Sequence, residues 1–572
     1  MSIDIETYRL KAQEAIEYVF VKEYHNSLGI PMPIVKMLLP DDANYSTGQY
    51  YITIDKTWQI HLNFGKLPIS YHEFQNEVKV LTRHEIEHYM CCPFDVITHF
   101  RMLKRIRDVY YKHFSHLGIN IEYACGAISN QAADIIVDTK NYYRHSKETL
   151  KSEIDWIKIG ANISACPRHC KLMFLTKEAI WKEDLGINET DPEFLKIVHQ
   201  LADSFTKNGI EDKSSFLDKV EEYAEIFFKL YVEDQKNPQQ SSQQGSQQQS
   251  GQQGPQQQSG QQGSQQQSGQ WGVGRPKDGD EHGNAFVFAD PDKVKEAIEV
   301  LAEETSVEEF IDLLAIAGII GMSDKQKGVL WFNVQSANII PIVEFSNTGN
   351  KSSYTYPSVW RIGDPIEELD LMLTYMTSPR LIPGMTTKKW GYVSNDDNGT
   401  ESKQMDLLLV VDTSGSMGSA MKESANMHQA VLASYGILSY FESTKSKVAL
   451  IGFSDKIDAY VDWSDKYDDV RERLLTNGHG GTKFPISRIK STLDVRSRDL
   501  VTVLITNGDL GNINESVSYF RDYLNDDNKL YIFLLGGSKS LHSYEPLKNI
   551  GAKIYNANNA NEFCDMVLTD ME

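Results

Sequence analysis

Residues 407–416 read Leu407-Leu-Leu-Val-Val411-Asp412-Thr-Ser-Gly-Ser416, and this stretch decides the fold of the C-terminal part of the chain. An aliphatic run that ends in an acidic, hydroxyl-rich turn predicts a buried parallel strand whose carboxyl end carries a cation-binding loop. Asp412 supplies a carboxylate, and Ser414 and Ser416 supply neutral oxygens at alternate positions. Hard oxygen donors of low total charge suit Mg2+. The sequence therefore predicts a magnesium site at the end of this strand.

Two later segments supply further oxygen ligands. Thr482 follows two glycines in a loop, and the apolar run 500–505 leads into Thr-Asn507-Gly-Asp509. Taken in this order, the three segments resemble the metal-ion-dependent adhesion site of von Willebrand factor type A domains. In that family an acidic residue directly follows the threonine of the second strand. Here Asn507 has that place, and Asp509, two residues further on, is the other candidate ligand.

The resemblance covers residues 405–572, and the pattern of this region predicts its fold. Five strand candidates alternate with helical patterns, near 406–411, 447–453, 500–505, 529–535 and 552–556. This alternation predicts a doubly wound parallel α/β sheet with its ligand site at the carboxyl ends of the strands. The alternative is that Asp412 and Ser414 only cap the following helix, since aspartate and serine favour such positions.

Length and composition limit the classes of function. A chain of 572 residues is too long for one core and predicts about three or four domains. The net charge of -22 disfavours nucleic acid and anionic membrane as partners. The longest apolar runs are of strand length, so no membrane span is expected. The start of the chain lacks a secretory pattern, and its six cysteines are typical of reduced thiols, which together predict a cytoplasmic protein.

A low-complexity segment divides the chain. Residues 236–272 are rich in glutamine, serine and glycine and contain three near-identical nine-residue units from Gln243 to Gly269. Such a composition cannot bury a core, so we expect a disordered, flexible tether. The domains predicted on either side are an α+β domain over 1–235, a mixed connecting region over 273–404, and the α/β domain.

A second motif lies in the N-terminal domain, where residues 84–88 read His84-Glu85-Ile-Glu87-His88 within a predicted helix over 74–90. Residues four apart share a helix face, so both imidazoles can bind one Zn2+, with Glu85 as general base toward a water. The alternative is a pair of histidines that only pack within the helix. Glu87 is expected to face solvent. The strand predicted over 58–64 is expected to form an edge on which a peptide lies extended.

A later helix, predicted over 128–143, carries Asp134 and Asp138 on one face. One of them can supply the third zinc ligand while the other orients a histidine. This pattern resembles zincin metallopeptidases, which have two carboxylates at that spacing on a downstream helix. By this resemblance we assign Asp134 as the ligand and Asp138 as the orienting group.

The combination of both arms resembles a prokaryotic family of zincin-like metallopeptidase proteins with a C-terminal von Willebrand A-like domain, associated with MoxR-type AAA+ ATPases. The resemblance implies a zinc-dependent peptidase or amidase coupled to a magnesium-dependent protein-binding domain, with such an ATPase or a client protein as partner. The alternative is a non-enzymatic adaptor of the chaperone type, which binds carboxylates of its partner through the magnesium site. An extracellular adhesion protein is disfavoured by the cysteine pattern and by the start of the chain.

Overall fold

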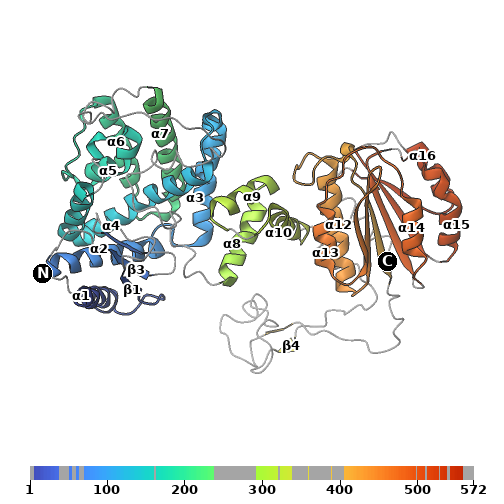
Figure 1. Cartoon of the computed structure of the whole chain (residues 1–572), viewed down its shortest axis with the longest axis horizontal. Coiled ribbons are helices and arrows are strands. Elements are labelled where there is room, and N and C mark those ends of the chain that lie inside the picture. The colour runs from blue at the N-terminus through green and yellow to red at the C-terminus, as the bar shows by residue number, and fades with distance from the viewer. Residues whose placement is uncertain are drawn as a thin grey trace, which may run out of the picture. The chain divides into compact units, whose positions relative to one another are not determined.

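The computed structural model divides into two compact units, one formed by Met1–Thr305 with Glu309–Gly321 and the other by Ser306–Glu308 with Met322–Glu572 (Figure 1). The chain is therefore multidomain. The structure describes residues 5–37, 51–54, 59–63, 70–159, 163–236, 291–319, 322–337, 358–359, 388–389, 405–496, 499–508, 510, 512–526, 528–536 and 541–557. Apart from residue 236, the predicted tether lies outside these residues.

A small three-stranded sheet accompanies the helices of the N-terminal unit. Its strands β1 (Ile34–Met37), β2 (Tyr51–Ile54) and β3 (Gln59–Asn63) have the order β1-β3-β2, with β1 parallel and β2 antiparallel to β3. The strand predicted over 58–64 is confirmed as β3. The prediction that residues 58–64 form an edge is wrong, because β3 is the central strand and pairs on both sides.

Most of the other described residues of the N-terminal unit are helical. Ser70 caps the first turn of α2 through a reciprocal pair of contacts with Glu73, and Asp95 caps α3. None of the described helices is both long enough and apolar enough to cross a membrane. The helices are α1 (Ile5–Glu17, continued by a π-helical segment to Glu23), α2 (Tyr71–Met90), α3 (Val96–Val109), α4 (Ile121–Ile159), α5 (Arg168–Trp181), α6 (Pro192–Thr206), α7 (Phe216–Lys236), α8 (Pro291–Glu304) and α9 (Val307–Ile316).

Helix α2 packs between α1 and α4. Its apolar face, which includes Phe74 and Val78, shares a buried cluster with Tyr8 and other residues of α1. This packing positions the residues of α2 that face α4. Helix α4 is much longer than the predicted 128–143, because its second half is polar and lacks the apolar pattern that the prediction used. One residue within α4, His145, interrupts the helical backbone.

The C-terminal unit contains a six-stranded mixed sheet. Its strands are β6 (Asp406–Asp412), β7 (Val448–Phe453), β8 (Ile457–Ser464), β9 (Leu500–Thr506), β10 (Lys529–Leu535) and β11 (Lys553–Ala557), in the order β11-β10-β9-β6-β7-β8. The five predicted strands are present and mutually parallel. The structure adds β8, which pairs antiparallel with β7 at the edge, so the prediction of a purely parallel sheet is wrong.

Helices cover both faces of this sheet. In Figure 1, α12 (Asn426–Ser443) and α13 (Tyr467–Leu474) lie on one face, whereas α14 (Ile486–Leu493), α15 (Val517–Asn525) and α16 (Leu541–Lys548) lie on the other. Helix α10 (Asp324–Ala337) packs on α12. A further pair of two-residue strands, β4 (Ser358–Val359) and β5 (Lys388–Lys389), is antiparallel.

The strand order determines where a ligand can bind. From β6 the chain proceeds through β7 to one edge, and from β9 it proceeds through β10 to the opposite edge. The carboxyl ends of the adjacent strands β6 and β9 thus border the point where the strand order reverses. In open α/β sheets this is the place where ligands bind.

Candidate functional site

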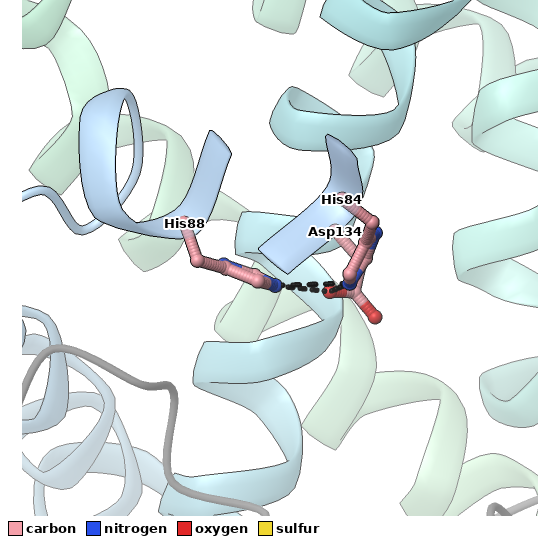
Figure 2. Close-up of side chains that lie close together, drawn as sticks. All are labelled: His84, His88 and Asp134. Atoms are coloured by element: carbon pink, nitrogen blue, oxygen red, sulfur yellow. Dashed lines mark hydrogen bonds and ion pairs between the residues drawn. The ribbon is translucent and has the colours of Figure 1, made fainter. Parts of the chain in front are cut away.

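Two histidines and an aspartate converge in the N-terminal unit. His84 and His88 lie one turn apart on α2, and Asp134 faces them from α4 (Figure 2). The Nε2 atom of His88 lies 3.1 Å from that of His84. One carboxylate oxygen of Asp134 lies 3.2 Å from His88 Nε2 and 3.5 Å from His84 Nε2. Among the described residues, this is the one group of at least three such side chains whose ligand atoms converge closely enough to hold a metal ion.

These three distances fit a tetrahedral zinc site. Zinc bonds of about 2.0–2.1 Å at tetrahedral angles hold the ligand atoms about 3.3 Å from one another. The distances of 3.1, 3.2 and 3.5 Å lie around this value. All three side chains are buried, as is Glu85, which follows His84 on α2 and is 5% exposed. The residues present therefore fit a Zn2+ ion with three protein ligands.

The other ring nitrogen of each histidine is also engaged. His84 Nδ1 lies 2.6 Å from an oxygen of Asp138, and His88 Nδ1 lies 2.9 Å from the carbonyl oxygen of Cys92. Each Nδ1–H group donates a hydrogen bond to its acceptor, so the proton of the ring stays on Nδ1. The lone pair on Nε2 then faces Asp134. The geometry thus places Asp134 beside the Nε2 atoms of both histidines and Asp138 behind His84. The Cys92 carbonyl was not foreseen, because a backbone acceptor leaves no signal in the side-chain pattern.

A buried lysine holds the second oxygen of Asp138. Lys177 on α5 lies 2.5 Å from this oxygen and 3.0 Å from Glu153. Burial opposes ionisation of Asp138, but the charge of Lys177 and the hydrogen bond from His84 outweigh it, so the pKa of Asp138 lies well below its ordinary value. Burial raises the pKa of Glu153 despite the same lysine. Lys177 was not predicted as a site residue, because it is 39 residues from Asp138 and belongs to no motif.

The expectation that Glu87 faces solvent is wrong, because its side chain is fully buried. One carboxylate oxygen lies 2.8 Å from Lys140, and the other accepts hydrogen bonds from Arg144 at 2.9 Å and Tyr24 at 3.0 Å. The charged residue inside the motif is therefore compensated by two cations. Its neighbour Arg83 is also buried and is similarly paired, through Glu23 and Glu148.

Four of the predicted magnesium ligands meet at the carboxyl ends of β6 and β9. Asp412 accepts hydrogen bonds from the Ser414 amide at 2.9 Å and from the Thr506 hydroxyl at 2.6 Å. The Ser414 and Ser416 hydroxyls lie 3.1 Å apart, and Ser416 donates to the Asn507 amide oxygen at 3.1 Å. One hydrogen-bonded cluster therefore contains Asp412, Ser414, Ser416 and Asn507.

Two further magnesium ligands were predicted, Thr482 and Asp509. Thr482 is half-buried in the loop after α13, and this loop approaches the site where the Gly415 amide donates to the Gly480 carbonyl at 3.3 Å. Asp509 lies outside the described residues. Thr506 was missed as a site residue, although its place at the end of an apolar strand beside that of Asp412 offered a signal.

Comparisons with known proteins do not assign this chain to a family. No family model and no curated protein matches it. Among solved structures, one match is an open-conformation crystal structure of the pilus adhesin SpaC from Lactobacillus rhamnosus GG, with 14% sequence identity and a TM-score of 0.24. The match covers 30% of this chain and 30% of the adhesin chain, and a likeness of this size carries no functional argument.

Proposed function

We propose that the N-terminal unit is a zinc-dependent hydrolase of peptide or related amide bonds, and that the C-terminal unit binds a protein partner through Mg2+. One observation carries the first part: the ligand atoms of His84, His88 and Asp134 converge at tetrahedral zinc spacing. Catalytic zinc sites have three protein ligands and an open position, whereas structural sites are closed by a fourth. Three ligands converge in the part of the chain described.

When bound, Zn2+ polarises a substrate carbonyl and makes water a stronger acid. The side chains around it have separate roles. His84 and His88 present their Nε2 lone pairs, because Asp138 and the Cys92 carbonyl hold the Nδ1 protons. Glu85, buried beside His84, is assigned to accept the proton of the attacking water and to pass it to the leaving amine. The zincin resemblance supports the same roles.

In the C-terminal unit, the cluster around Asp412 supports the second part of the proposal. Asp412, Ser414 and Ser416 would hold Mg2+, with Thr482 and either Asn507 or Asp509 completing the set. Oxygen ligands of low charge leave a coordination position for a carboxylate from outside. The family resemblance makes a MoxR-type AAA+ ATPase or a client protein the partner. The five described cysteines are free thiols, which supports a reducing compartment such as the cytoplasm.

A non-enzymatic adaptor is the second candidate, and the burial of the zinc group favours it. His84, His88 and Asp134 are each at most 4% exposed. An extended peptide reaches such a group only after a local opening. In this candidate the zinc is structural, and the magnesium site alone performs the function by binding partner carboxylates.

Zinc content and peptide cleavage separate these candidates. We expect near-stoichiometric zinc in the purified full-length chain by elemental analysis, and its loss in His84→Ala. A peptide library is then incubated with the wild type and with Glu85→Gln, which retains the ligands. Cleavage by the wild type alone supports the hydrolase, and zinc without cleavage supports the adaptor. A folded wild type that takes up no zinc, even when zinc is supplied, refutes the metal site.

A further inference from the structure

Lys177 is a buried cation that the proposed chemistry does not use. Its side chain is 2% exposed, and its ammonium group lies between two carboxylates, 2.5 Å from Asp138 and 3.0 Å from Glu153. Burial of a lysine requires compensation by neighbouring charges. Lys177 comes from α5, whereas both carboxylates come from α4. The contact therefore joins two helices directly behind the proposed zinc site.

Asp138 divides its two oxygens between different partners. One oxygen accepts from His84 Nδ1 at 2.6 Å, and the other accepts from Lys177 at 2.5 Å. With both oxygens held, the carboxylate cannot rotate about its terminal bond without losing a charge-assisted hydrogen bond. The orientation of Asp138 fixes the His84 ring, whose Nε2 atom faces Asp134 and His88.

The buried charges behind the site also depend on this lysine. Asp134, Asp138 and Glu153 are three carboxylates, and Lys177 contacts two of them. Without Lys177, the His84 ring is the one hydrogen-bond partner of Asp138 that remains among the described residues. The Asp138 carboxylate is then no longer held on its second oxygen and can turn away from the ring. Such a rotation breaks the hydrogen bond from His84 Nδ1.

We infer that Lys177 is a positioning residue for the zinc site, which holds the Asp138 carboxylate in the orientation at which His84 presents Nε2 to the metal. This inference rests on the proposed zinc site. It adds that a residue of α5, a helix that supplies none of the three ligands, affects the affinity of the site for the metal. Partners behind metal-binding histidines typically change metal affinity by about 10–100-fold when they are removed. We expect an effect near the lower end of this range for Lys177, because it acts through Asp138.

The competing explanation is an ion pair that only stabilises the fold. Helix α5 offers a matched control for this role in Lys171, which is 8% exposed and lies 2.8 Å from Glu189. Both lysines form a buried ion pair from the same helix, but Lys171 pairs with a residue outside the zinc group. A purely structural role predicts similar consequences for Lys177→Met and Lys171→Met.

The test is the zinc affinity of the full-length chain, measured by competition with a chromophoric chelator. Binding that persists in His84→Ala is subtracted, so that other sites do not contribute. We expect Lys177→Met to weaken binding about tenfold and Lys171→Met to change it less than about threefold. In the Asp138→Asn background, Lys177→Met is expected to weaken zinc binding further by less than about threefold, because Asp138, through which Lys177 acts, is already altered.

Each outcome decides the inference. Wild-type affinity in folded Lys177→Met, an equal loss in Lys171→Met, or an undiminished effect in Asp138→Asn overturns it. If Lys177→Met does not fold, the measurement is repeated with Lys177→Gln, which keeps an N–H donor. If Lys177→Gln is also unfolded in the presence of zinc, the lysine is structural and the inference is rejected. The zinc affinity of the wild type, compared with that of His84→Ala, tests the proposed zinc site itself. Loss of peptidase activity with zinc retained concerns only the proposed hydrolysis.

Discussion

Replacement of Glu87 by alanine is expected to destabilise the N-terminal unit by about 3 kcal/mol. Removal of one partner from a buried ion pair costs about 3–5 kcal/mol, because the other charge is left uncompensated. Lys140 is that charge, with a side chain 8% exposed. It retains a contact with Glu211 at 3.2 Å, and the second cation, Arg144, is 47% exposed and can turn toward water. The lower end of the range therefore applies.

Differential scanning calorimetry of the full-length chain measures this effect. The transition that rises on addition of zinc identifies the N-terminal unit. For a unit of this size each kcal/mol shifts the Tm by about 2–4 °C, so Glu87→Ala should lower it by about 6–12 °C. Glu225 on α7 is exposed and serves as the control, and Glu225→Ala should change the stability by less than about 0.5 kcal/mol.

A second variant tests the physical reason. The double variant Glu87→Ala/Lys140→Met removes both charges, and it should recover most of the lost stability because no buried charge is left uncompensated. A Tm reduction below about 2 °C in Glu87→Ala would refute the reasoning. A double variant no more stable than the single one would also refute it, because the cost would then come from lost packing rather than from Lys140.

Three further predictions concern other groups. Burial raises the pKa of Glu77 in the folded chain. The stability that protonated Glu77 contributes is therefore complete below the ordinary pKa of a glutamate, and it is lost as the pH rises through the pKa of the folded state. Glu77→Gln, which is neutral at every pH, should raise the Tm more at pH 7.5 than at pH 5. Thr506→Val leaves Asp412 without a 2.6 Å hydrogen bond and should cost the C-terminal unit about 1–3 kcal/mol in thermal unfolding, whereas an unchanged Tm would contradict this bond. Asn507→Asp places a second carboxylate beside Ser416 and should strengthen Mg2+ binding roughly tenfold in titration calorimetry; equal or weaker binding would exclude residue 507 as a ligand.

Local patterns in the sequence were sufficient for much of the fold and for three members of the zinc group. The four-residue spacing of His84 and His88 places both on one face of a helix, whatever surrounds it. The same spacing relates Asp134 to Asp138. Apolar runs of strand length likewise predicted the five parallel strands of the C-terminal sheet, because buried parallel strands need aliphatic residues on both faces.

Polar and edge strands were harder to predict. Strand β8 is mostly half-buried and has a single buried residue, so its sequence lacks the aliphatic run of its neighbours. The order of the small N-terminal sheet could not be predicted, because β3 pairs with one neighbour in parallel and with the other antiparallel. Pairing of strands depends on packing across the whole unit.

The sequence by itself determined which side chains share a helix face and which stretches must be buried, since both follow from backbone periodicity and hydrophobicity. Only the tertiary structure decided which charges meet. His84 and Asp138 are separated by 54 residues, and Thr506 and Asp412 by 94. Tertiary packing likewise brings Lys140 to Glu87 and Lys177 to Asp138. Ion pairs and hydrogen bonds act over a few ångströms, so their partners are selected by the packing of helices and strands and not by distance along the chain.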